Sequence, residues 1–568
     1  MSRPERIGAF LCTCGKTLAG SLKFEDLKNQ ALSLPGVSFC HVHDALCQEN
    51  GREFLGKEIH SSQPDAVVIG GCSPRGHGAI FKRLFMKWGL DEEALEVVDI
   101  REGCAWVHAD TQDGASAKAQ GLLRMGWARL AAKEPTQDTT ITLLDSALVL
   151  GGGPAGMSAA VGLGRQGLRV YLVEKDATIG GRLRSLSSLY PSGDEAAGIL
   201  NRLKGEVETL PLITILRQSE IAGVKGYVGN FQVQLRGGEE SKIIRAGAIV
   251  LAMGAQSLAP RELFRYGDLK GVVSQDELES GMRQGEDLGG TTVFIQCAGS
   301  RIPGRPYCSS ICCPVALKNA RAIRLRWPQS RVFLLHRDVM APGIDLERLY
   351  HQAMEANVRF LRYSPEHPPS LEGTDRVQKV KVLDILSGRE TVLEADRVVL
   401  STPLVANPGN AKLAEMLSIL TDDYGFFSDR SVLEPNRMVT PGVYSCGTSR
   451  WPCSVREAIL QGQSVAASVA TLLRKKTAQA SDFGPMEGVK GWPAVVKESA
   501  CSGCGNCSQA CPSKAIGLQL SDGRKIARVN KVRCTGCGTC AAVCSGGAIQ
   551  TQTLSDSMAT KMIHEAFG

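Results

Sequence analysis

The sequence predicts an α/β protein in which a doubly wound core lies between an N-terminal α/β domain and a small C-terminal α+β domain. Strand-like and amphipathic segments alternate through residues 1–135. A glycine-rich turn near residue 151 separates an apolar segment from an Ala-rich one. One cysteine spacing occurs twice near the C-terminus. The length of 568 residues also favours several domains, and we expect three: 1–138, 139–476 and 477–568.

Composition excludes several classes of protein. No apolar window reaches the roughly 18 residues of a transmembrane helix, so we expect no membrane span. The start, MSRPERIGAFLCTCG, lacks the apolar region of a signal peptide. Twenty cysteines without a secretion signal favour metal clusters in a reducing cytoplasm over disulfides. The formal net charge of +7 comes from scattered basic residues without a Lys/Arg block, so we expect no nucleic-acid binding.

The N-terminal domain has four strand-like segments, and each ends at or near a cysteine. The segments are Ile7–Cys12, Val37–Cys40, Ala66–Gly70 and Leu95–Asp99. Because the ends of parallel strands meet at one edge of a sheet, we expect the thiols to gather there. They could be a thiol cluster that caps, or adds a ligand to, a metal centre elsewhere, or free buried cysteines. The cysteines are Cys12, Cys14, Cys40, Cys47, Cys72 and Cys104, with Arg75, His77 and His108 nearby in sequence.

A dinucleotide-binding motif begins the predicted core. An apolar strand, Ala147–Leu150, precedes Gly151-x-Gly153-x-x-Gly156, and a helix and a second strand, Arg169–Val173, follow. The glycines allow a tight turn against a pyrophosphate, and the helix N-terminus supplies N–H donors. A glutamate then ends the second strand, where a carboxylate can bind ribose hydroxyls. The residues predicted to bind the dinucleotide are Gly151, Gly153, Pro154, Ala155, Gly156, Glu174 and Lys175.

Three later segments favour FAD as the dinucleotide. Ile179–Leu183 contains a Gly-Gly pair where two-domain flavoproteins contact the FAD phosphates. Ala246–Ala255 reads as a buried strand that ends in a glycine turn. GVYSCGT, from residue 442, is similar to a closing flavoprotein signature, although Thr448 stands where an acidic residue is often found. The three segments together predict a thioredoxin-reductase-like FAD core. Its further FAD-binding residues are Gly181, Arg182, Gly254 and Gly447.

The second nucleotide-binding turn of such flavoproteins is missing. The strand Thr291–Gln296 is present, but a cysteine-containing segment follows it instead of a glycine triplet. We interpret its cysteines as ligands of a [4Fe–4S] cluster close to the flavin. A redox-active disulfide and buried structural thiols remain alternatives. We therefore expect that no nicotinamide bound on this chain reduces the flavin. The cysteines are Cys297, Cys308, Cys312 and Cys313.

The repeated cysteine spacing near the C-terminus is that of bacterial two-cluster ferredoxins. Each run has the form Cys-x2-Cys-x2-Cys-x3-Cys, and the fourth cysteine of each run serves the other cluster. A proline follows the first run, whereas Ser545 follows the second. One predicted [4Fe–4S] ligand set is Cys501, Cys504, Cys507 and Cys544. The other is Cys534, Cys537, Cys540 and Cys511.

These features together resemble the A subunit of heterodisulfide reductase over essentially the whole chain. The resemblance implies that the four cysteines from Cys297 to Cys313 are cluster ligands. It also implies that Lys318 approaches flavin N5 and acts in catalysis. We find no further ferredoxin cysteine set between residues 183 and 290, so the shorter bacterial members are the more similar. The specific motifs are FLCTCG at 10–15, GGCSPRGH at 70–77, REGCAWVH at 101–108, GGGPAGM at 151–157 and CAGSRIPGRPYCSSICCPVALKNA at 297–320.

From these parts we hypothesise a cytoplasmic FAD and iron–sulfur electron-transfer subunit of an anaerobic redox complex. It would pass electrons between a partner donor, ferredoxin and a second acceptor, by flavin-based electron bifurcation. The resemblance implies partners such as heterodisulfide reductase B- or C-like subunits, a hydrogenase or a dehydrogenase, with a homodimer inside a larger assembly. One alternative is a self-sufficient NAD(P)H:ferredoxin or disulfide oxidoreductase, which needs a nicotinamide site. Another is a passive relay in which FAD is structural.

Overall fold

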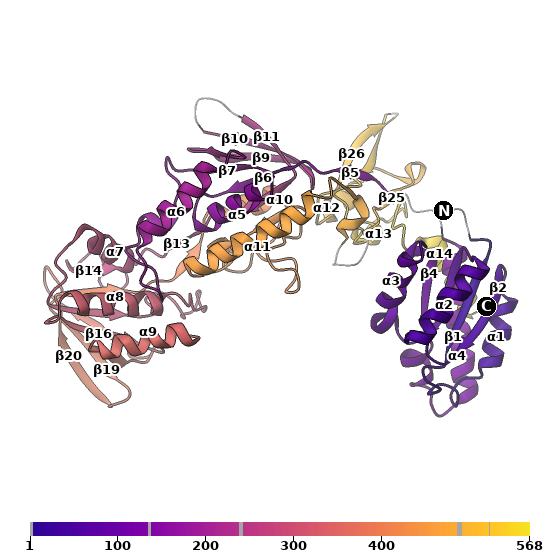
Figure 1. Cartoon of the computed structure of the whole chain (residues 1–568), viewed down its shortest axis with the longest axis horizontal. Helices are drawn as coiled ribbons and strands as arrows, with labels where there is room; N and C mark the ends of the chain where they lie inside the picture. Colours follow the sequence, from indigo (N-terminus) through magenta and orange to yellow (C-terminus); the bar gives the residue numbers. More distant parts are fainter. Residues whose placement is uncertain (1–3, 134–137, 238–241, 485–490, 522, 568) are drawn as a thin grey trace. The chain divides into compact units, whose positions relative to one another are not determined.

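The computed structural model describes residues 4–133, 138–237, 242–484, 491–521 and 523–567, and it divides into two compact units (Figure 1). Unit 1 consists of Met1–Thr139, Lys490–Cys511 and Ala515–Gly568. Unit 2 consists of Thr140–Val489 and Pro512–Lys514. The N-terminal and C-terminal segments thus belong to the same unit, and the division into three domains stays a prediction.

The N-terminal part of unit 1 is a parallel sheet in the order β2-β1-β3-β4, with helices on both faces. Alternate residues of β1 face opposite sides: Leu11 packs with α1 and α4, whereas Phe10 packs with α2 and α3. All four predicted strands are therefore confirmed. The strands are β1 (Ile7–Cys12), β2 (Val37–His43), β3 (Ala66–Gly71) and β4 (Leu95–Asp99), and the helices are α1 (Phe24–Ser33), α2 (Glu49–Ser62), α3 (Ala79–Lys87) and α4 (Gln112–Ala131).

The C-terminal part of unit 1 has short elements around a cysteine-rich core and a final helix. That helix, α14 (Asp556–Phe567), packs along α4 of the N-terminal sheet. Arg124 Nε donates a hydrogen bond to the Glu565 carbonyl at 2.7 Å, and Lys561 lies over the Trp127 ring. The last helix thus ties the two parts together. The other elements are β25 (Val495–Val496), α12 (Asn506–Ala510), β26 (Ile516–Ser521), β27 (Arg524–Val529), α13 (Thr539–Ala542) and β28 (Ile549–Gln550).

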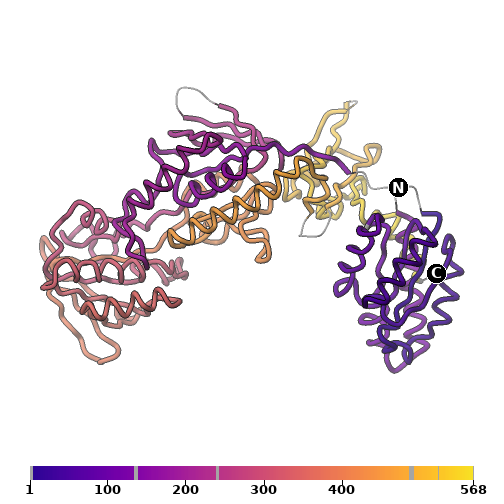
Figure 2. Tube along the Cα trace, in the orientation of Figure 1, coloured from indigo at the N-terminus to yellow at the C-terminus, as the bar shows by residue number. Residues whose placement is uncertain are grey.

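The first layer of unit 2 is a five-stranded parallel sheet in the order β23-β12-β6-β7-β8. The helices α5 and α11 pack against each other, and Figure 2 traces both through this part of the unit. A three-stranded antiparallel sheet shares an apolar core with the parallel one. The elements are β6 (Ser146–Leu150), α5 (Pro154–Arg165), β7 (Arg169–Val173), α6 (Ala196–Thr209), β8 (Ile213–Leu216), β9 (Glu220–Tyr227), β10 (Asn230–Arg236), β11 (Lys242–Ala246), β12 (Ala248–Leu251), β23 (Val443–Ser445) and α11 (Val455–Leu473).

A second parallel sheet of unit 2 has the order β14-β21-β15-β16-β17. Four of its strands, β21-β15-β16-β17, correspond to β12-β6-β7-β8 of the first sheet, whereas the edge strand differs. It carries helices of its own and a small antiparallel sheet, which confirms a doubly wound α/β class for this core. The elements are β14 (Val272–Ser274), α7 (Gln275–Gln284), β15 (Thr291–Ile295), α8 (Cys312–Arg326), β16 (Arg331–His336), α9 (Ile344–Glu355), β17 (Val358–Arg362), β18 (Ser370–Glu372), β19 (Lys379–Asp384), β20 (Arg389–Glu394) and β21 (Arg397–Leu400).

The remaining elements of unit 2 connect these layers. The pair β13 (Ala255–Ser257) and β22 (Leu404–Ala406) is antiparallel, and α10 (Asn410–Leu417) follows it. The segment of residues 477–491 begins as β24 (Thr477–Gln479), which pairs with β5 (Thr140–Thr142). Residues 485–490 of that segment lie outside the described residues. None of the helices in the described part of the chain has the length and apolar character to cross a bilayer.

Candidate functional site

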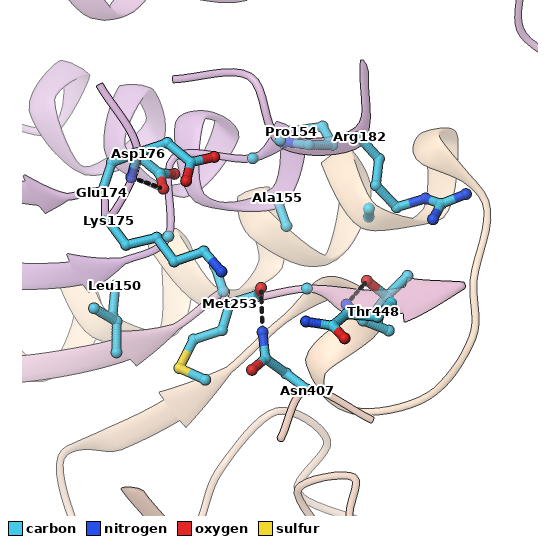
Figure 3. Close-up of a pocket in the computed structure, with 18 of the residues that line it drawn as sticks. Leu150, Pro154, Ala155, Glu174, Lys175, Asp176, Arg182, Met253, Asn407 and Thr448 are labelled. Carbon is cyan, nitrogen blue, oxygen red and sulfur yellow. Dashed lines mark hydrogen bonds between the residues drawn. The ribbon is translucent and has the colours of Figure 1, made fainter. Parts of the chain in front are cut away.

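A cavity of about 940 Å³ lies in unit 2 at the carboxyl ends of β6 and β7 (Figure 3). Residues after β12, the segment around Asn407 and the start of α11 complete its wall. The carboxyl edge of a parallel sheet is where nucleotides bind in doubly wound folds. The volume lies at the upper end of the range for ligand pockets, as an extended dinucleotide requires.

The glycine turn between β6 and α5, which borders the cavity, fits a pyrophosphate. Gly151 has φ +108°, and a Cβ there would lie 2.3 Å from the Ala252 carbonyl oxygen. A Cβ on Gly156 would lie 1.8 Å from the Gly151 carbonyl oxygen, so this glycine allows the helix to pack on the turn. A Cβ on Gly153 would meet no protein atom within 4 Å, because this residue faces open space. The amides of the first turn of α5 border that space, which suits a phosphate.

Glu174, directly after β7, binds the glycine turn that follows β6. The carboxylate is buried; its Oε2 accepts from the Gly152 amide at 2.8 Å and its Oε1 accepts from the Asp176 amide at 3.0 Å (Figure 3). Each oxygen keeps a second lone pair. The carboxylate therefore holds the glycine turn in place and can also accept hydrogen bonds from ribose hydroxyls.

Most of the predicted dinucleotide-binding residues line the cavity, but two do not. Gly156 and Gly447 lie behind the wall; a Cβ on Gly447 would approach the Ala155 Cβ to 2.7 Å. These two glycines allow close packing of helices, and their role as ligands stays a prediction. The predicted residues that line the cavity are Gly151, Gly153, Pro154, Ala155, Glu174, Lys175, Gly181, Arg182 and Gly254.

Several residues that line the cavity were not among the predicted site residues. Thr448 Oγ1 accepts from the Ala255 amide at 2.9 Å, and Asn407 Nδ2 donates to the Met253 carbonyl at 3.4 Å. These bonds join the end of the first sheet to distant loops. The only sequence signal for these two hydrogen bonds was the position of Thr448 beside Gly447. Others, including Tyr190 and Cys453, lie in none of the sequence motifs.

The cysteines that replace the second glycine turn are gathered in one place. Burial, and to a smaller extent the neighbouring thiols of Cys297 and Cys308, raise the pKa of Cys313 to about 12. The pKa of Cys312 is also raised, first by burial and then by Cys313, Cys297 and Cys308. Four thiols that repel one another's charge are suited to a cationic centre that would take them as thiolates. A [4Fe–4S] cluster fits this donor set.

This cysteine group borders the dinucleotide cavity. Ile311 and Val315, which flank the pair Cys312-Cys313 at the start of α8, line the cavity. Cys312 Sγ lies 3.4 Å from the Thr402 carbonyl oxygen. Burial, and to a smaller extent the charge of Cys312, raises the pKa of Tyr190, which also lines the cavity. The connection between β15 and α8 thus places thiols next to residues of the cavity wall, whereas the connection between β6 and α5 places glycines in the wall itself.

Lys318 lies on α8 but is not among the residues that line the cavity. Its Nζ forms an ion pair with Glu279 of α7 and donates to the Ser188 carbonyl at 3.0 Å. Both charged side chains are buried, at 6% and 1% exposure, and burial lowers the pKa of Lys318. Glu279 also accepts from the Ser187 amide at 2.8 Å. Contact between Lys318 and flavin N5 stays a prediction.

Six of the eight C-terminal cysteines share one core. Cys507, Cys534 and Cys540 are buried with Ala515 and Ile549, and further cysteines pack against them. Backbone amides approach four sulfurs: Ala527 to Cys501, Ala548 to Cys544, Ala494 to Cys534 and Ala515 to Cys511, at 3.3–3.5 Å. Such N–H···S contacts tune cluster potentials. One small cavity is lined by Cys501, Cys504, Cys507 and Cys544, the first predicted ligand set.

The second predicted ligand set is also gathered. Burial, and to a smaller extent the thiols of Cys534, Cys511 and Cys537, raise the pKa of Cys540 to about 11. In each ligand set, therefore, the fourth cysteine comes from the other run: Cys544 lies with the first run and Cys511 with the second. The residues fit two cubane clusters, and their role as ligands stays a prediction.

The N-terminal thiols gather only in part, so the expectation of one shared edge is wrong for two of them. Cys40 lies inside β2, which extends to His43, and it packs in the apolar core. Cys104 belongs to the same core, and its Sγ donates to the Ala115 carbonyl at 3.2 Å. The sequence placed Cys40 at the end of its strand because the polar residues that follow it resemble a loop.

Comparisons with known proteins match the nucleotide-binding part and the C-terminal cysteine-rich part of the chain to two different families. The family model described as pyridine nucleotide-disulphide oxidoreductase matches residues 145–289, and the 4Fe-4S dicluster domain matches 500–548. An iron-sulfur A subunit of the CoB–CoM heterodisulfide reductase of Methanopyrus kandleri is 30% identical over 93% of this chain and 92% of its own length. The A subunit of the H2:CoB-CoM heterodisulfide, ferredoxin reductase of Methanothermobacter thermautotrophicus is 29% identical over 90% of this chain and 91% of its own.

A solved structure is also similar. The thioredoxin reductase of T. acidophilum is 17% identical, with a TM-score of 0.42, over 57% of this chain and 97% of that one.

Proposed function

The chain belongs to the family of the A subunit of CoB–CoM heterodisulfide reductase, and from this premise we propose that it is an electron-bifurcating FAD and iron–sulfur subunit. It is an oxidoreductase with a 4Fe-4S dicluster domain. We propose that the cavity of unit 2 binds FAD and that Cys297, Cys308, Cys312 and Cys313 hold a [4Fe–4S] cluster beside it. The C-terminal cysteines would hold two more.

The observation that carries the proposal is the cysteine group next to Ile311 and Val315, which line the dinucleotide cavity. The match to the pyridine-nucleotide family ends at residue 289, before β15 and the connection that follows it. In that connection, thiols occupy the place of a second glycine turn. FAD, when bound, exchanges electrons singly or in pairs, and [4Fe–4S] clusters exchange them one at a time. A chain with both can join a two-electron donor to one-electron acceptors.

The chain's own residues would support this exchange in two ways. Backbone amides at Cys501, Cys511, Cys534 and Cys544 stabilise added negative charge on the sulfurs. Burial of Cys507, Cys534 and Cys540 in an apolar core, and of Cys313 at the start of α8, keeps water from these sulfur atoms. Electrons would enter from a partner donor and leave toward ferredoxin and a second acceptor carried by other redox subunits.

A single cysteine variant tests the electron route. We expect Cys537→Ala to lose about four iron atoms per chain and to keep FAD. The rate at which reduced ferredoxin bleaches the flavin in an anaerobic stopped-flow experiment should then fall at least about tenfold. Cys104→Ala, a buried thiol outside every predicted ligand set, is the control. An unchanged bleaching rate in Cys537→Ala would show that the C-terminal clusters are not on the route.

A further inference from the structure

Two arginines lie beside the cysteine group of unit 2. Arg301 is in the connection between β15 and α8, and Arg337 directly follows β16, the strand that pairs with β15. Because the two strands are parallel, both arginines lie at the carboxyl edge of the sheet, where the cysteine-containing connection begins. Residues 297–313 include two arginines but no Asp or Glu. All the carboxylate and guanidinium charge that this connection itself carries is therefore positive.

Hydrogen bonds join the two arginines to each other and to the cysteine group. Arg337 Nη1 donates to the Arg301 carbonyl at 2.8 Å, and Arg301 Nη2 pairs with the Asp338 carboxylate at 3.0 Å. The Asp338 carbonyl oxygen lies 3.8 Å from Cys313 Sγ. Arg362, at the end of β17, donates to the Arg337 carbonyl at 2.8 Å and to the Asp338 carboxylate at 3.0 Å. Residues at the ends of three neighbouring strands thus fix the guanidinium groups beside the cysteines.

The nearby carboxylates offset only part of this positive charge. Asp338 pairs with Arg301 and Arg362, and Asp384 accepts from the Arg362 amide at 3.1 Å. Arg337 Nη1 instead donates to a neutral carbonyl, and its Nε is buried without an acceptor among the residues that the structure describes. Arg337 therefore contributes a positive charge together with an N–H group that is free to donate.

Both arginines act electrostatically on Cys297, the first cysteine of the group. Burial raises the pKa of the Cys297 thiol, whereas the charges of Arg301 and Arg337 and a hydrogen bond from Arg301 lower it. Cations that stabilise this thiolate also stabilise negative charge on a cluster bound to it. Because one electron adds one negative charge to a cluster, a fixed cation nearby stabilises the reduced form more than the oxidised form.

From this geometry we propose that Arg301 and Arg337 raise the reduction potential of the unit 2 cluster, which is the [4Fe–4S] cluster proposed on the four cysteines of residues 297–313. The inference rests on the proposed function, since this cluster is part of that proposal. The C-terminal cysteines receive hydrogen bonds from neutral backbone amides, whereas the unit 2 cluster also has charged neighbours. It should therefore accept an electron at a higher potential than it would beside neutral side chains.

The test is an anaerobic redox titration of the full-length holoprotein, followed by electron paramagnetic resonance. The signal of the unit 2 cluster is the one that Cys312→Ala/Cys313→Ala loses. We expect Arg337→Gln to lower the ratio of reduced to oxidised cluster at a fixed potential at least about tenfold, which corresponds to about 59 mV for one electron. Arg301→Gln should shift the potential in the same direction, because it also removes a positive charge.

Lysine variants separate the effect of charge from that of packing. Arg337→Lys and Arg301→Lys keep the positive charge and should restore most of the wild-type potential. Arg331→Gln is the matched control, because it removes an exposed arginine from the opposite end of β16 and should leave the potential unchanged. Iron and FAD content should equal those of the wild type in all these single variants.

Three results would overturn the inference, and only one of them also removes the proposed function. The arginines do not set the potential if both glutamine variants titrate as the wild type does. Packing is responsible if the lysine variants shift the potential as far as the glutamine variants. If Cys312→Ala/Cys313→Ala loses neither iron nor a signal, the unit 2 cluster is absent, and the proposed function fails together with the inference.

Discussion

The two parallel sheets of unit 2 share the order of four strands, β12-β6-β7-β8 in one and β21-β15-β16-β17 in the other, but they differ at the connection that follows β6 and β15. In the first sheet, β6 leads through three residues into α5, and glycines leave room for a phosphate. In the second, β15 leads through Cys297 and Cys308 to the paired cysteines that begin α8. One scaffold thus supports two chemistries, because the sheet fixes where a loop lies and the loop residues decide what it binds.

The largest effect that this comparison predicts is on the thiol-bearing connection. We expect Cys312→Ala/Cys313→Ala to lose about four iron atoms per chain, because it removes two of the four proposed ligands. FAD should remain, because the glycine turn and Glu174 are untouched. Iron analysis and the visible spectrum would measure both. Cys104→Ala should keep all its iron. Full iron content in the double variant would favour buried structural thiols or a redox disulfide.

The glycine-bearing connection should respond in the opposite way. Gly153→Ala adds a methyl group where no protein atom lies within 4 Å, and the backbone there, at φ −76°, accepts alanine. We expect normal folding and iron content, but FAD affinity weaker by at least about tenfold, because the methyl group enters the phosphate space. Isothermal titration of the FAD-depleted chain would measure it. Gly198→Ala, on an exposed helix face with open space, should leave the affinity unchanged.

A smaller effect is expected at the helix that carries the paired cysteines. Lys318→Met leaves Glu279 charged and buried, which should lower the free energy of unfolding by about 3 kcal/mol. Adding Glu279→Gln should restore most of that loss. Lys270→Met is the control, since the Lys270–Asp375 pair is 79% and 78% exposed and should contribute under about 1 kcal/mol. Equal denaturation midpoints for Lys318→Met and the wild type would contradict the role of the buried pair.

Local patterns in the sequence predict more of this molecule than long-range contacts do. The strands around the glycine turn and the crossing of cysteines between the two C-terminal runs follow from spacing alone. The pairing of Lys318 with Glu279 could not be predicted, because it joins two helices with no shared motif. Nor could the burial of Cys40 inside β2, because the residues after it are polar and the strand continues through them.

The central claim is that thiols occupy the place of a nicotinamide-binding turn in the second sheet. The most direct test is to add NADH, and then NADPH, to the anaerobic holoprotein and to follow the visible absorption band of the flavin. The account predicts that the band persists with either nucleotide and bleaches only when a copurifying redox partner and its donor are supplied. Rapid bleaching by NADH or NADPH alone would contradict it and would show a self-sufficient reductase.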